Sequence, residues 1–357
     1  MDIKKLLKPY LRDIMIYEPG MDKEEHVKLS SNENPRGPHP RIVAAVTNML
    51  KDANRYPPSG SPELTRALAG RHGVDASEIM VGNGSNEIID LLVRAFVNPD
   101  ENLKYPVPSF IVYALIAKIC GCKGIGVDCK DYRLDLAAMK KAVNDKTRMV
   151  FVCNPNNPTS TYVTAAELDE FLKGLREDVL VVMDEAYFDY VAVDDYPDSE
   201  TLRKKRNTII ILRTFSKFYS LAAIRIGYAI ADPEVVMALH RVRQPFNVNR
   251  IAQVAGLAAL ECMDELRPMA QETIAERERV RQVALELGMA CPPSQANFVF
   301  VDLGESTLDL YQALYEHEVI VRRMGQFGSS KNTYRISIGT KEENDRLIAA
   351  MRAVYGK

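Results

Sequence analysis

The chain has 357 residues, a length that favours two domains, or one large α/β domain with an appendage, over a single small module. Hydrophobic residues make up 46% and charged residues 26%, as in soluble globular proteins, so the composition excludes a disordered chain. The formal net charge of -2 provides no overall positive field for nucleic acid or anionic membrane. We therefore expect a small-molecule partner, no nucleic acid and no membrane, and, without an apolar leader or spanning segment, a cytoplasmic location.

Short apolar runs rich in β-branched residues alternate with longer amphipathic stretches along most of the chain. The apolar runs predict strands at residues 78–82, 123–128, 148–153, 179–184, 208–213 and 224–230. The amphipathic stretches predict helices at residues 86–96, 134–143, 165–175 and 251–262. This alternation is typical of an α/β sheet, mostly parallel, with helices on both faces.

The C-terminal part shows a different pattern. It begins with a long predicted helix at 263–287 and ends with one at 341–355, and its predicted strands are fewer, at 298–303, 319–323 and 333–339. This pattern indicates a smaller α+β domain. We expect three parts, which are an N-terminal arm at 1–35, a large domain at 36–265 and a small C-terminal domain at 266–357.

Cysteines and histidines indicate neither a disulfide scaffold nor a metal site. The six cysteines are few for this length and none forms a Cys-x-x-Cys pair, although Cys120 and Cys122 lie close enough to be redox-active. The five histidines are scattered, with no two at the spacing of a helical metal site. We expect free thiols and no metal.

Four loops that follow predicted strands carry the polar side chains of interest, because ligands of open α/β sheets bind at the carboxyl ends of the strands. The first, residues 82–86 (GNGSN), leads into a helix, where glycine permits a tight turn and free amides favour an anion. The second, residues 154–160, has two prolines and three asparagines and can fix the direction of an amide side chain. An ordinary capped turn explains either loop taken alone.

The third and fourth loops carry charged groups. The third follows an apolar strand that ends in Asp184, with Tyr187 three residues on. A carboxylate there is costly unless it meets a cation or a donor, and capping of a neighbouring turn would also satisfy it. The fourth loop contains two hydroxyls, a lysine and an arginine, which are Thr214, Ser216, Lys217 and Arg225. A partly desolvated lysine loses its proton readily and forms a Schiff base, whereas most loop lysines are simply solvated.

Together the loops supply a phosphate cradle, an amide, a carboxylate and a lysine, which are the parts that pyridoxal 5'-phosphate (PLP) needs. The sequence resembles the fold-type I PLP-dependent aminotransferases, and among them the histidinol-phosphate aminotransferase family. The resemblance runs through KLSSNENPRGP, NRYP, GNGSNE, YPVPSF, NPNNPTS, DEAYFDY, TFSKFYSLAAIRIGY, QPFNVNRIAQ, SQANFVFV and YRISIGTKEEN, in the family's order and spacing. It implies PLP as cofactor, a large domain with a mostly parallel seven-stranded sheet, and a smaller α+β C-terminal domain.

The resemblance also implies roles for individual residues around the cofactor. Lys217 would form the Schiff base and shuttle a proton between the substrate α-carbon and the cofactor. Asp184 would pair with the pyridine nitrogen and keep it protonated, Asn157 and Tyr187 would donate to the phenolic oxygen, and Phe110 would stack on the ring. The phosphate would be held by Gly84, Ser85, Asn86, Thr214, Ser216 and Arg225, together with Tyr56 of the other subunit.

Substrate binding follows from the same resemblance, as does a homodimer with shared active sites. Arg335 matches the arginine that takes the α-carboxylate of glutamate, and Arg322 the one that helps bind the phosphate of histidinol phosphate. A surface ion pair is the alternative for both, and Arg323 adjoins Arg322 on a strand that sends neighbours to opposite faces. Tyr17 would be a lid contact and Asn34 would line the pocket.

The implied function is that of a transaminase in histidine biosynthesis. It would exchange the amino group between L-histidinol phosphate and 2-oxoglutarate, giving imidazole acetol phosphate and L-glutamate in two half-reactions. The alternatives are an aromatic amino-acid aminotransferase of the same family and a non-catalytic PLP-fold protein that serves as a regulatory module. Two residues depart from the family pattern. Ser160 replaces a glycine and would be strained if its φ is positive, and Phe110 replaces the commoner tyrosine.

Overall fold

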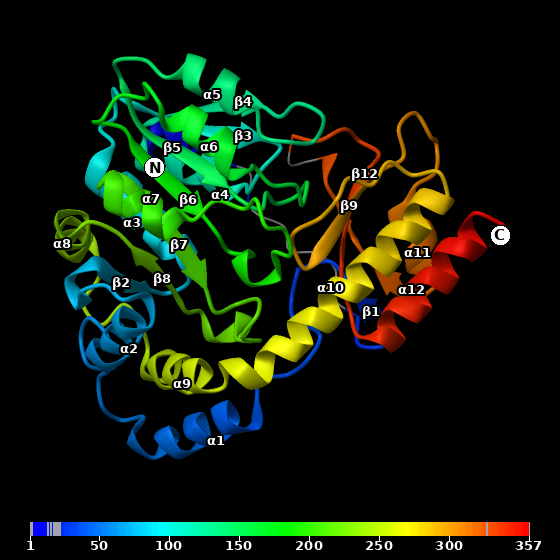
Figure 1. Cartoon of the computed structure of the whole chain (residues 1–357), viewed down its shortest axis with the longest axis horizontal. Coiled ribbons are helices and arrows are strands. Elements are labelled where there is room, and N and C mark those ends of the chain that lie inside the picture. Colours follow the sequence, from blue (N-terminus) through cyan, green and yellow to red (C-terminus); the bar gives the residue numbers. More distant parts are fainter. Residues whose placement is uncertain (1–2, 13, 15, 17–22, 326–327, 357) are drawn as a thin grey trace.

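The computed structural model describes residues 3–12, 14, 16, 23–325 and 328–356, and it divides into a larger and a smaller part (Figure 1). The larger part is built on a seven-stranded sheet with the order β2-β8-β7-β6-β5-β3-β4. All neighbouring strands are parallel except β8, which is antiparallel to both β2 and β7. The strands are β2 (Ile79–Gly82), β3 (Asn102–Val107), β4 (Lys123–Asp128), β5 (Thr147–Cys153), β6 (Leu180–Asp184), β7 (Ile209–Thr214) and β8 (Gly227–Ile230). The expected mostly parallel sheet is confirmed.

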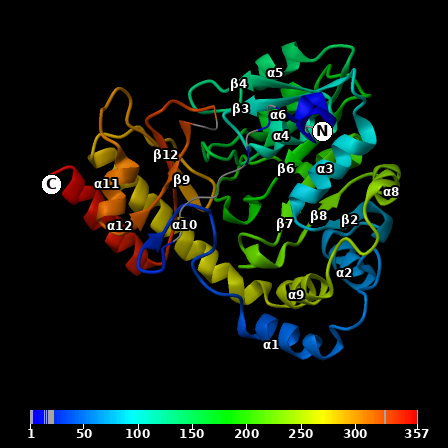
Figure 2. The ribbon, with the colours of Figure 1, turned by 180° about the vertical axis from the view of Figure 1, so that it is seen from behind.

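Helices cover both faces of this sheet, and each face has its own apolar core. One face carries α3 (Ser85–Phe96), α4 (Val112–Cys120) and α8 (Pro233–Val242), which are on the near side in the view from behind (Figure 2). The other face carries α2 (Pro62–His72), α5 (Leu136–Ala142), α6 (Ala165–Leu172), α7 (Ser199–Lys205) and α9 (Arg250–Glu261), and α1 (Pro40–Met49) packs against α9. Because both faces are buried, the central strands are nearly continuous apolar runs.

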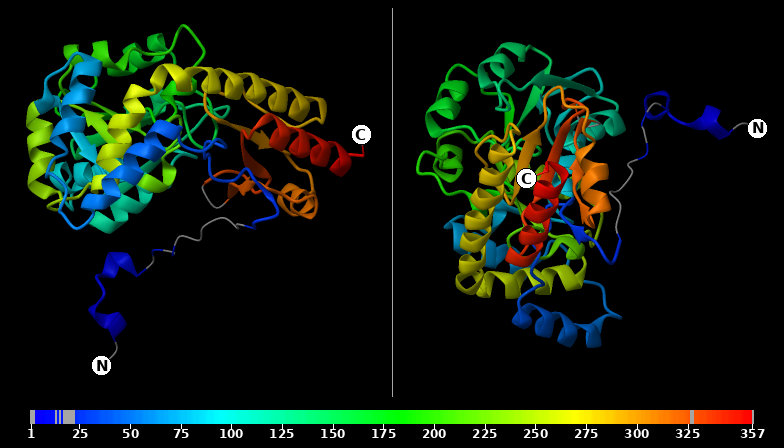
Figure 3. Two further views of the ribbon diagram at one scale, coloured as in Figure 1. Left: turned by 90° about the horizontal axis from the view of Figure 1, so that it is seen from below. Right: turned by 90° about the vertical axis from the view of Figure 1, so that its right-hand side faces the viewer.

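The smaller part has an antiparallel sheet in the order β11-β12-β9, with helices packed against it. Its elements are α10 (Met263–Glu286), β9 (Phe298–Asp302), α11 (Leu310–Glu316), β10 (Val319–Ile320), β11 (Arg322–Arg323), β12 (Thr333–Ser337) and α12 (Lys341–Val354). Helix α10 runs from the larger part into the smaller one, where it contacts α12 (Figure 3).

The segment around β1 joins the smaller part before the chain enters α1 of the larger one. Strand β1 (Val27–Lys28) pairs in parallel with β10, although its residues lie in the expected arm. The segment after β1 then crosses to α1. The domain limits expected from the sequence remain predictions.

Strand β3 was missed in the sequence because Lys104 and Pro106 interrupt its apolar run. Among the residues that the structure describes, no helix is both long and apolar enough to cross a membrane.

Candidate active site

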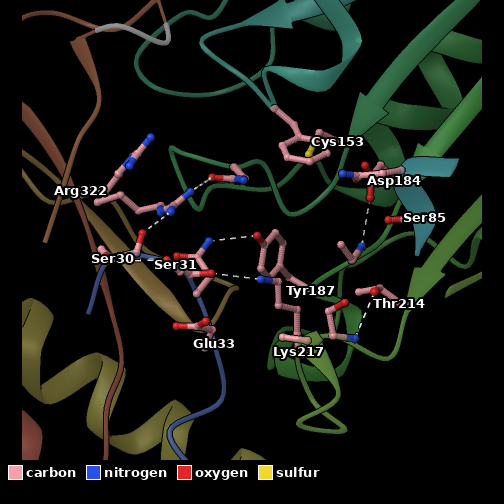
Figure 4. Close-up of a pocket in the computed structure, with 18 of the residues that line it drawn as sticks. Ser30, Ser31, Glu33, Ser85, Cys153, Asp184, Tyr187, Thr214, Lys217 and Arg322 are labelled. Carbon is pink, nitrogen blue, oxygen red and sulfur yellow. Dashed lines mark hydrogen bonds between the residues drawn. The ribbon is translucent and has the colours of Figure 1, made fainter. Parts of the chain in front are cut away.

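A cavity of about 310 Å³ lies at the carboxyl ends of β5, β6 and β7, where the larger part meets the smaller one (Figure 4). It collects side chains from five loops of the larger part, which follow β2, β3, β5, β6 and β7, from the segment after β1, and from β11 and β12. Twelve residues expected in the site line it, namely Ser85, Asn86, Phe110, Asn157, Asp184, Tyr187, Thr214, Ser216, Lys217, Arg225, Arg322 and Arg335.

One end of the cavity is an anion cradle at the N-terminus of α3. Gly84 caps this helix with a φ of 79°, and a Cβ on it would lie 2.7 Å from the Arg225 guanidinium. A Cβ on Gly227 of β8 would lie 2.5 Å from the backbone nitrogen of Ser85. The glycines thus let backbone amides and a guanidinium converge on one point. Arg225 also reaches the Ser216 hydroxyl at 3.3 Å, so the donor set fits a phosphate group.

Asp184 ends β6 inside the protein, and burial raises the pKa of its carboxyl group. It accepts hydrogen bonds from the Tyr113 hydroxyl at 2.6 Å and from the backbone N–H of Ala186 at 3.3 Å. A buried carboxylate is stabilised by a cation, and the protonated nitrogen of PLP meets that need. Tyr113 was missed in the sequence, although it lies one helical turn after Phe110, whose ring it contacts edge-on at 5.7 Å.

Lys217 is partly buried in the loop after β7. Its ammonium donates to the carbonyl oxygen of Ser31 at 3.3 Å and lies 6.0 Å from the centre of the Tyr187 ring. The pKa of Lys217 is lowered to about 7, chiefly by burial and also by the charges of Arg335 and Arg225, while Glu33 opposes the shift. A large share of this amine is therefore uncharged near neutral pH, the state that attacks a carbonyl carbon.

The other end of the cavity carries two arginines directly opposite each other, since Arg322 of β11 is in register with Arg335 of β12. Arg335 donates to the Asn157 side-chain oxygen and to the carbonyl oxygen of Ser30, both at 2.7 Å. Arg322 is buried, whereas its neighbour Arg323 is exposed and pairs with Asp309. The expected alternation along this strand thus turns Arg322, and not Arg323, toward the site.

Several expected residues lie elsewhere. The Asn34 amide donates to the carbonyl oxygen of Phe218 at 3.1 Å and lines a neighbouring pocket. Tyr56 is 83% exposed and stacks on Phe246 at 4.9 Å. Tyr17 lies outside the described residues. Ser160, which replaces a glycine of the family pattern, has a positive φ of 61°, the conformation expected to strain it.

Other lining residues had no assigned role in the sequence. Asn32 donates to the Tyr187 hydroxyl at 3.0 Å, and Glu33 and Cys153 also line the cavity. Asn32 belongs to the Ser-Ser-Asn-Glu-Asn-Pro stretch, from which only Asn34 was expected in the site. The sequence feature that could have identified Asn32 is its place in KLSSNENPRGP, one of the motifs that carry the resemblance.

Comparison with known proteins agrees with this geometry. Residues 24–351 match the family model described as aminotransferase class I and II. The chain is 39% identical to histidinol-phosphate aminotransferase 2 of Pseudomonas fluorescens, over 100% of this chain and 99% of that protein. It is 38% identical to an aromatic amino acid aminotransferase of Mycobacterium sp. (strain KMS), over 98% of this chain and 99% of that protein.

Among solved structures, the histidinol-phosphate aminotransferase of Sinorhizobium meliloti in complex with PLP superposes with a TM-score of 0.89. The sequences are 27% identical, and the superposition covers 98% of this chain and 97% of the other. The aminotransferase fold expected from the motifs is confirmed. The chain belongs to the class I and II aminotransferase family.

Proposed function

We propose that the protein is a PLP-dependent aminotransferase of histidine biosynthesis that exchanges the amino group between L-histidinol phosphate and 2-oxoglutarate. Its cofactor is PLP, whose protonated ring withdraws electrons from the substrate carbon that loses its proton. The observation that carries the proposal is the cavity itself. It holds a lysine with a lowered pKa, a buried carboxylate, an anion cradle and two further arginines.

Different residues of the chain bind different parts of the cofactor. Ser85, Ser216 and Arg225 hold the phosphate end of the cofactor, and Asp184 holds a proton on the ring nitrogen. Lys217 supplies the amine that binds the cofactor, and its Nζ, with a pKa of about 7, can take up and return a proton near neutral pH. Arg335 fixes the oxygen of the Asn157 amide, so that the amide nitrogen is free to donate into the cavity.

The paired arginines support substrates with strongly anionic groups. Like charges directly opposite each other on two strands repel, and an anion between them removes that cost. The cofactor phosphate has its own cradle at the other end of the cavity. We therefore assign both arginines to the substrates, Arg335 to the α-carboxylate of glutamate and Arg322 to the phosphate of histidinol phosphate.

An aromatic amino-acid aminotransferase is the second candidate, because a relative with that name is 38% identical over nearly the whole chain. The two functions differ in the need for a second anion site. The first experiment follows the visible spectrum of the PLP-loaded protein after L-histidinol phosphate, phenylalanine or tyrosine is added. Conversion by histidinol phosphate at low concentration supports the proposal. Conversion only by the aromatic amino acids supports the second candidate, and no conversion by any of them supports a regulatory module.

The variant Arg322→Ala tests the assignment of the substrate phosphate. A charge-assisted hydrogen bond contributes about 1.5–3 kcal/mol, so the KM for histidinol phosphate should rise about tenfold or more. The KM for glutamate should change much less, and Arg323→Ala, on the opposite face of the same strand, is the matched control. Equal losses for both substrates would contradict the role of Arg322.

We also infer a cytoplasmic homodimer in which Tyr56 completes the phosphate site of the partner subunit. Tyr56 and Phe246 form an exposed aromatic pair beside a hollow of about 520 Å³ on the larger part. Aromatic residues such as Tyr and Phe are enriched at protein interfaces. The phosphate cradle in one chain has three donors of its own, and a phenol from a second chain would add another.

A further inference from the structure

Asn32 lies in the segment between β1 and α1, and it is almost completely buried although its segment is a loop. Its backbone is left-handed, with a φ of 53°. Asparagine tolerates this conformation better than most residues because its short side chain bonds locally. A buried polar residue in an uncommon conformation is held there by its surroundings, and such residues cluster at functional sites.

Hydrogen bonds from three other segments hold Asn32. Its backbone N–H donates to the Ser337 hydroxyl oxygen at 2.8 Å, and that hydroxyl donates in turn to Asn32 Oδ1 at 3.2 Å. The Asn297 amide donates to the Asn32 carbonyl oxygen at 3.1 Å. The remaining group, Asn32 Nδ2, donates to the Tyr187 hydroxyl oxygen at 3.0 Å, a bond drawn at Tyr187 in Figure 4.

This network sets the direction of the Asn32 amide. The Ser337 hydroxyl already accepts the backbone N–H, so its own proton is available for the amide oxygen. The amide NH₂ then faces Tyr187 and can only donate to it. Since the Tyr187 oxygen accepts from Asn32, its own proton is free to point elsewhere, and the open side is the cavity.

We propose that Asn32 is a positioning residue, held by Ser337 and Asn297, that makes the Tyr187 hydroxyl a donor toward the cofactor rather than toward the protein. This inference rests on the proposed PLP-dependent function. The Tyr187 proton directed into the cavity would stabilise negative charge on the phenolic oxygen of the bound cofactor. The Lys217 nitrogen that holds the cofactor would then lose its proton more readily.

The surroundings of Tyr187 agree with a neutral donor. The pKa of Tyr187 is raised to about 12, because burial outweighs the opposing effects of Arg335 and of the hydrogen bond from Asn32. The further charged or titratable groups around it are Asp184, Cys153 and Lys217. The phenol therefore keeps its proton through the working range of pH, and its effect depends on where that proton points.

The decisive variant is Asn32→Asp, which keeps the size of the side chain and tolerates the left-handed backbone. A carboxylate accepts only, so it takes the Tyr187 proton away from the cavity. The measurement is the midpoint of the pH titration of the visible absorption of the PLP-loaded protein. We expect a rise of about one pH unit or more relative to the wild type. In a Tyr187→Phe background the same substitution should shift the midpoint much less, because the two residues act through one bond.

Ser337→Ala is the second variant, for the case in which Asn32→Asp does not fold. It removes the proton that orients the amide, and it should raise the midpoint by a smaller amount that Tyr187→Phe again suppresses. An unchanged midpoint in Asn32→Asp, together with a lower unfolding temperature of the PLP-free protein, would show a structural role only. An equal shift with and without Tyr187 would show a direct charge effect and overturn the proposal. A wild type that forms no titrating visible band with PLP would instead refute the function on which it rests.

Discussion

At the level of single residues, loss of water shifts the pKa values of Asp184 and Lys217 in opposite directions. Burial disfavours the charged form of each group, so it raises the pKa of the carboxyl and lowers that of the amine. The site thus keeps a lysine that is partly uncharged beside a carboxylate that is ready for a cation. The lowered pKa of Lys217 suits attack on a carbonyl cofactor, whereas the buried Asp184 needs a cation such as a protonated ring nitrogen to stay ionised.

The lowered pKa of Lys217 is testable in the PLP-free protein. Above a pH of about 7 the neutral amine predominates, so its reductive methylation should reach half its maximal rate near that pH. Mass spectrometry of digested protein labelled between pH 6 and 10 measures this, with the exposed lysines of the same sample as the reference. If the methylation of Lys217 rises with pH only in the range where the exposed lysines also react, the lowered pKa of Lys217 is contradicted.

Tyr113 is expected to control the charge of Asp184. Tyr113→Phe removes the 2.6 Å hydrogen bond and leaves the ring stacked on Phe151 at 4.4 Å. A bond to a charged group contributes about 1.5–3 kcal/mol, so less Asp184 is ionised and kcat should fall about tenfold. Steady-state kinetics with both substrates measure the loss. Tyr105→Phe, which removes a tyrosine hydroxyl outside the site, is the control, and an equal loss there would exclude a specific role.

At the level of elements, the loop after β5 combines precise anchoring with backbone strain. Asn156 donates to the carbonyl oxygen of Pro108 and to the Thr159 hydroxyl, and it accepts from Ser109. These bonds hold the loop that presents Asn157 to the cavity. Ser160 ends the loop with a φ of 61° and a buried hydroxyl for which no partner is found among the described residues.

Ser160→Gly should therefore stabilise the protein. Glycine adopts a positive φ without steric cost, and removal of an unpaired buried hydroxyl removes a further penalty, so the gain should be about 1 kcal/mol or more. Denaturant unfolding of the PLP-free protein measures it. Ser160→Ala keeps the strain and removes only the hydroxyl, so its gain should be the smaller of the two. If Ser160→Gly is destabilising, the strain at this position does not exist.

The strands and side chains around the cavity show how far the sequence could predict the site. Strong apolar runs such as β6 and β7 were expected correctly, and so were the loops at their carboxyl ends, because a buried parallel sheet requires that pattern. The bond between Tyr113 and Asp184 could not be read from the sequence, since 70 intervening residues must fold before they meet. Asn32 posed the same difficulty, because its partners Tyr187, Asn297 and Ser337 come from distant segments.

At the level of the whole molecule, the site is formed where two parts of the chain meet. Lys217 and Asp184 belong to the larger part, Arg322 and Arg335 to the smaller one, and Ser31 to the segment that connects them. Movement of one part against the other would change the distance from Lys217 and Asp184 to the two arginines. The cradle for the phosphate lies wholly in the larger part, so cofactor binding should depend less on such movement than substrate binding does.

A subunit-mixing experiment tests the shared site. Lys217→Ala should be inactive, and Tyr56→Ala should have weak activity because its cofactor phosphate loses a donor. If Tyr56 acts across the interface, a hybrid dimer has one site with both residues intact. Random mixing should then restore about a quarter of the wild-type activity, since half of the dimers are hybrids with one good site. Steady-state assays of an equimolar mixture, denatured and refolded together, measure the recovery.

Lys217→Ala mixed with Asp184→Asn is the control, because both changes fall in the site of their own chain and no intact site can form. Recovery in the first mixture and none in the control requires that Tyr56 serves the partner, whereas no recovery in either places Tyr56 outside the reaction or within its own subunit.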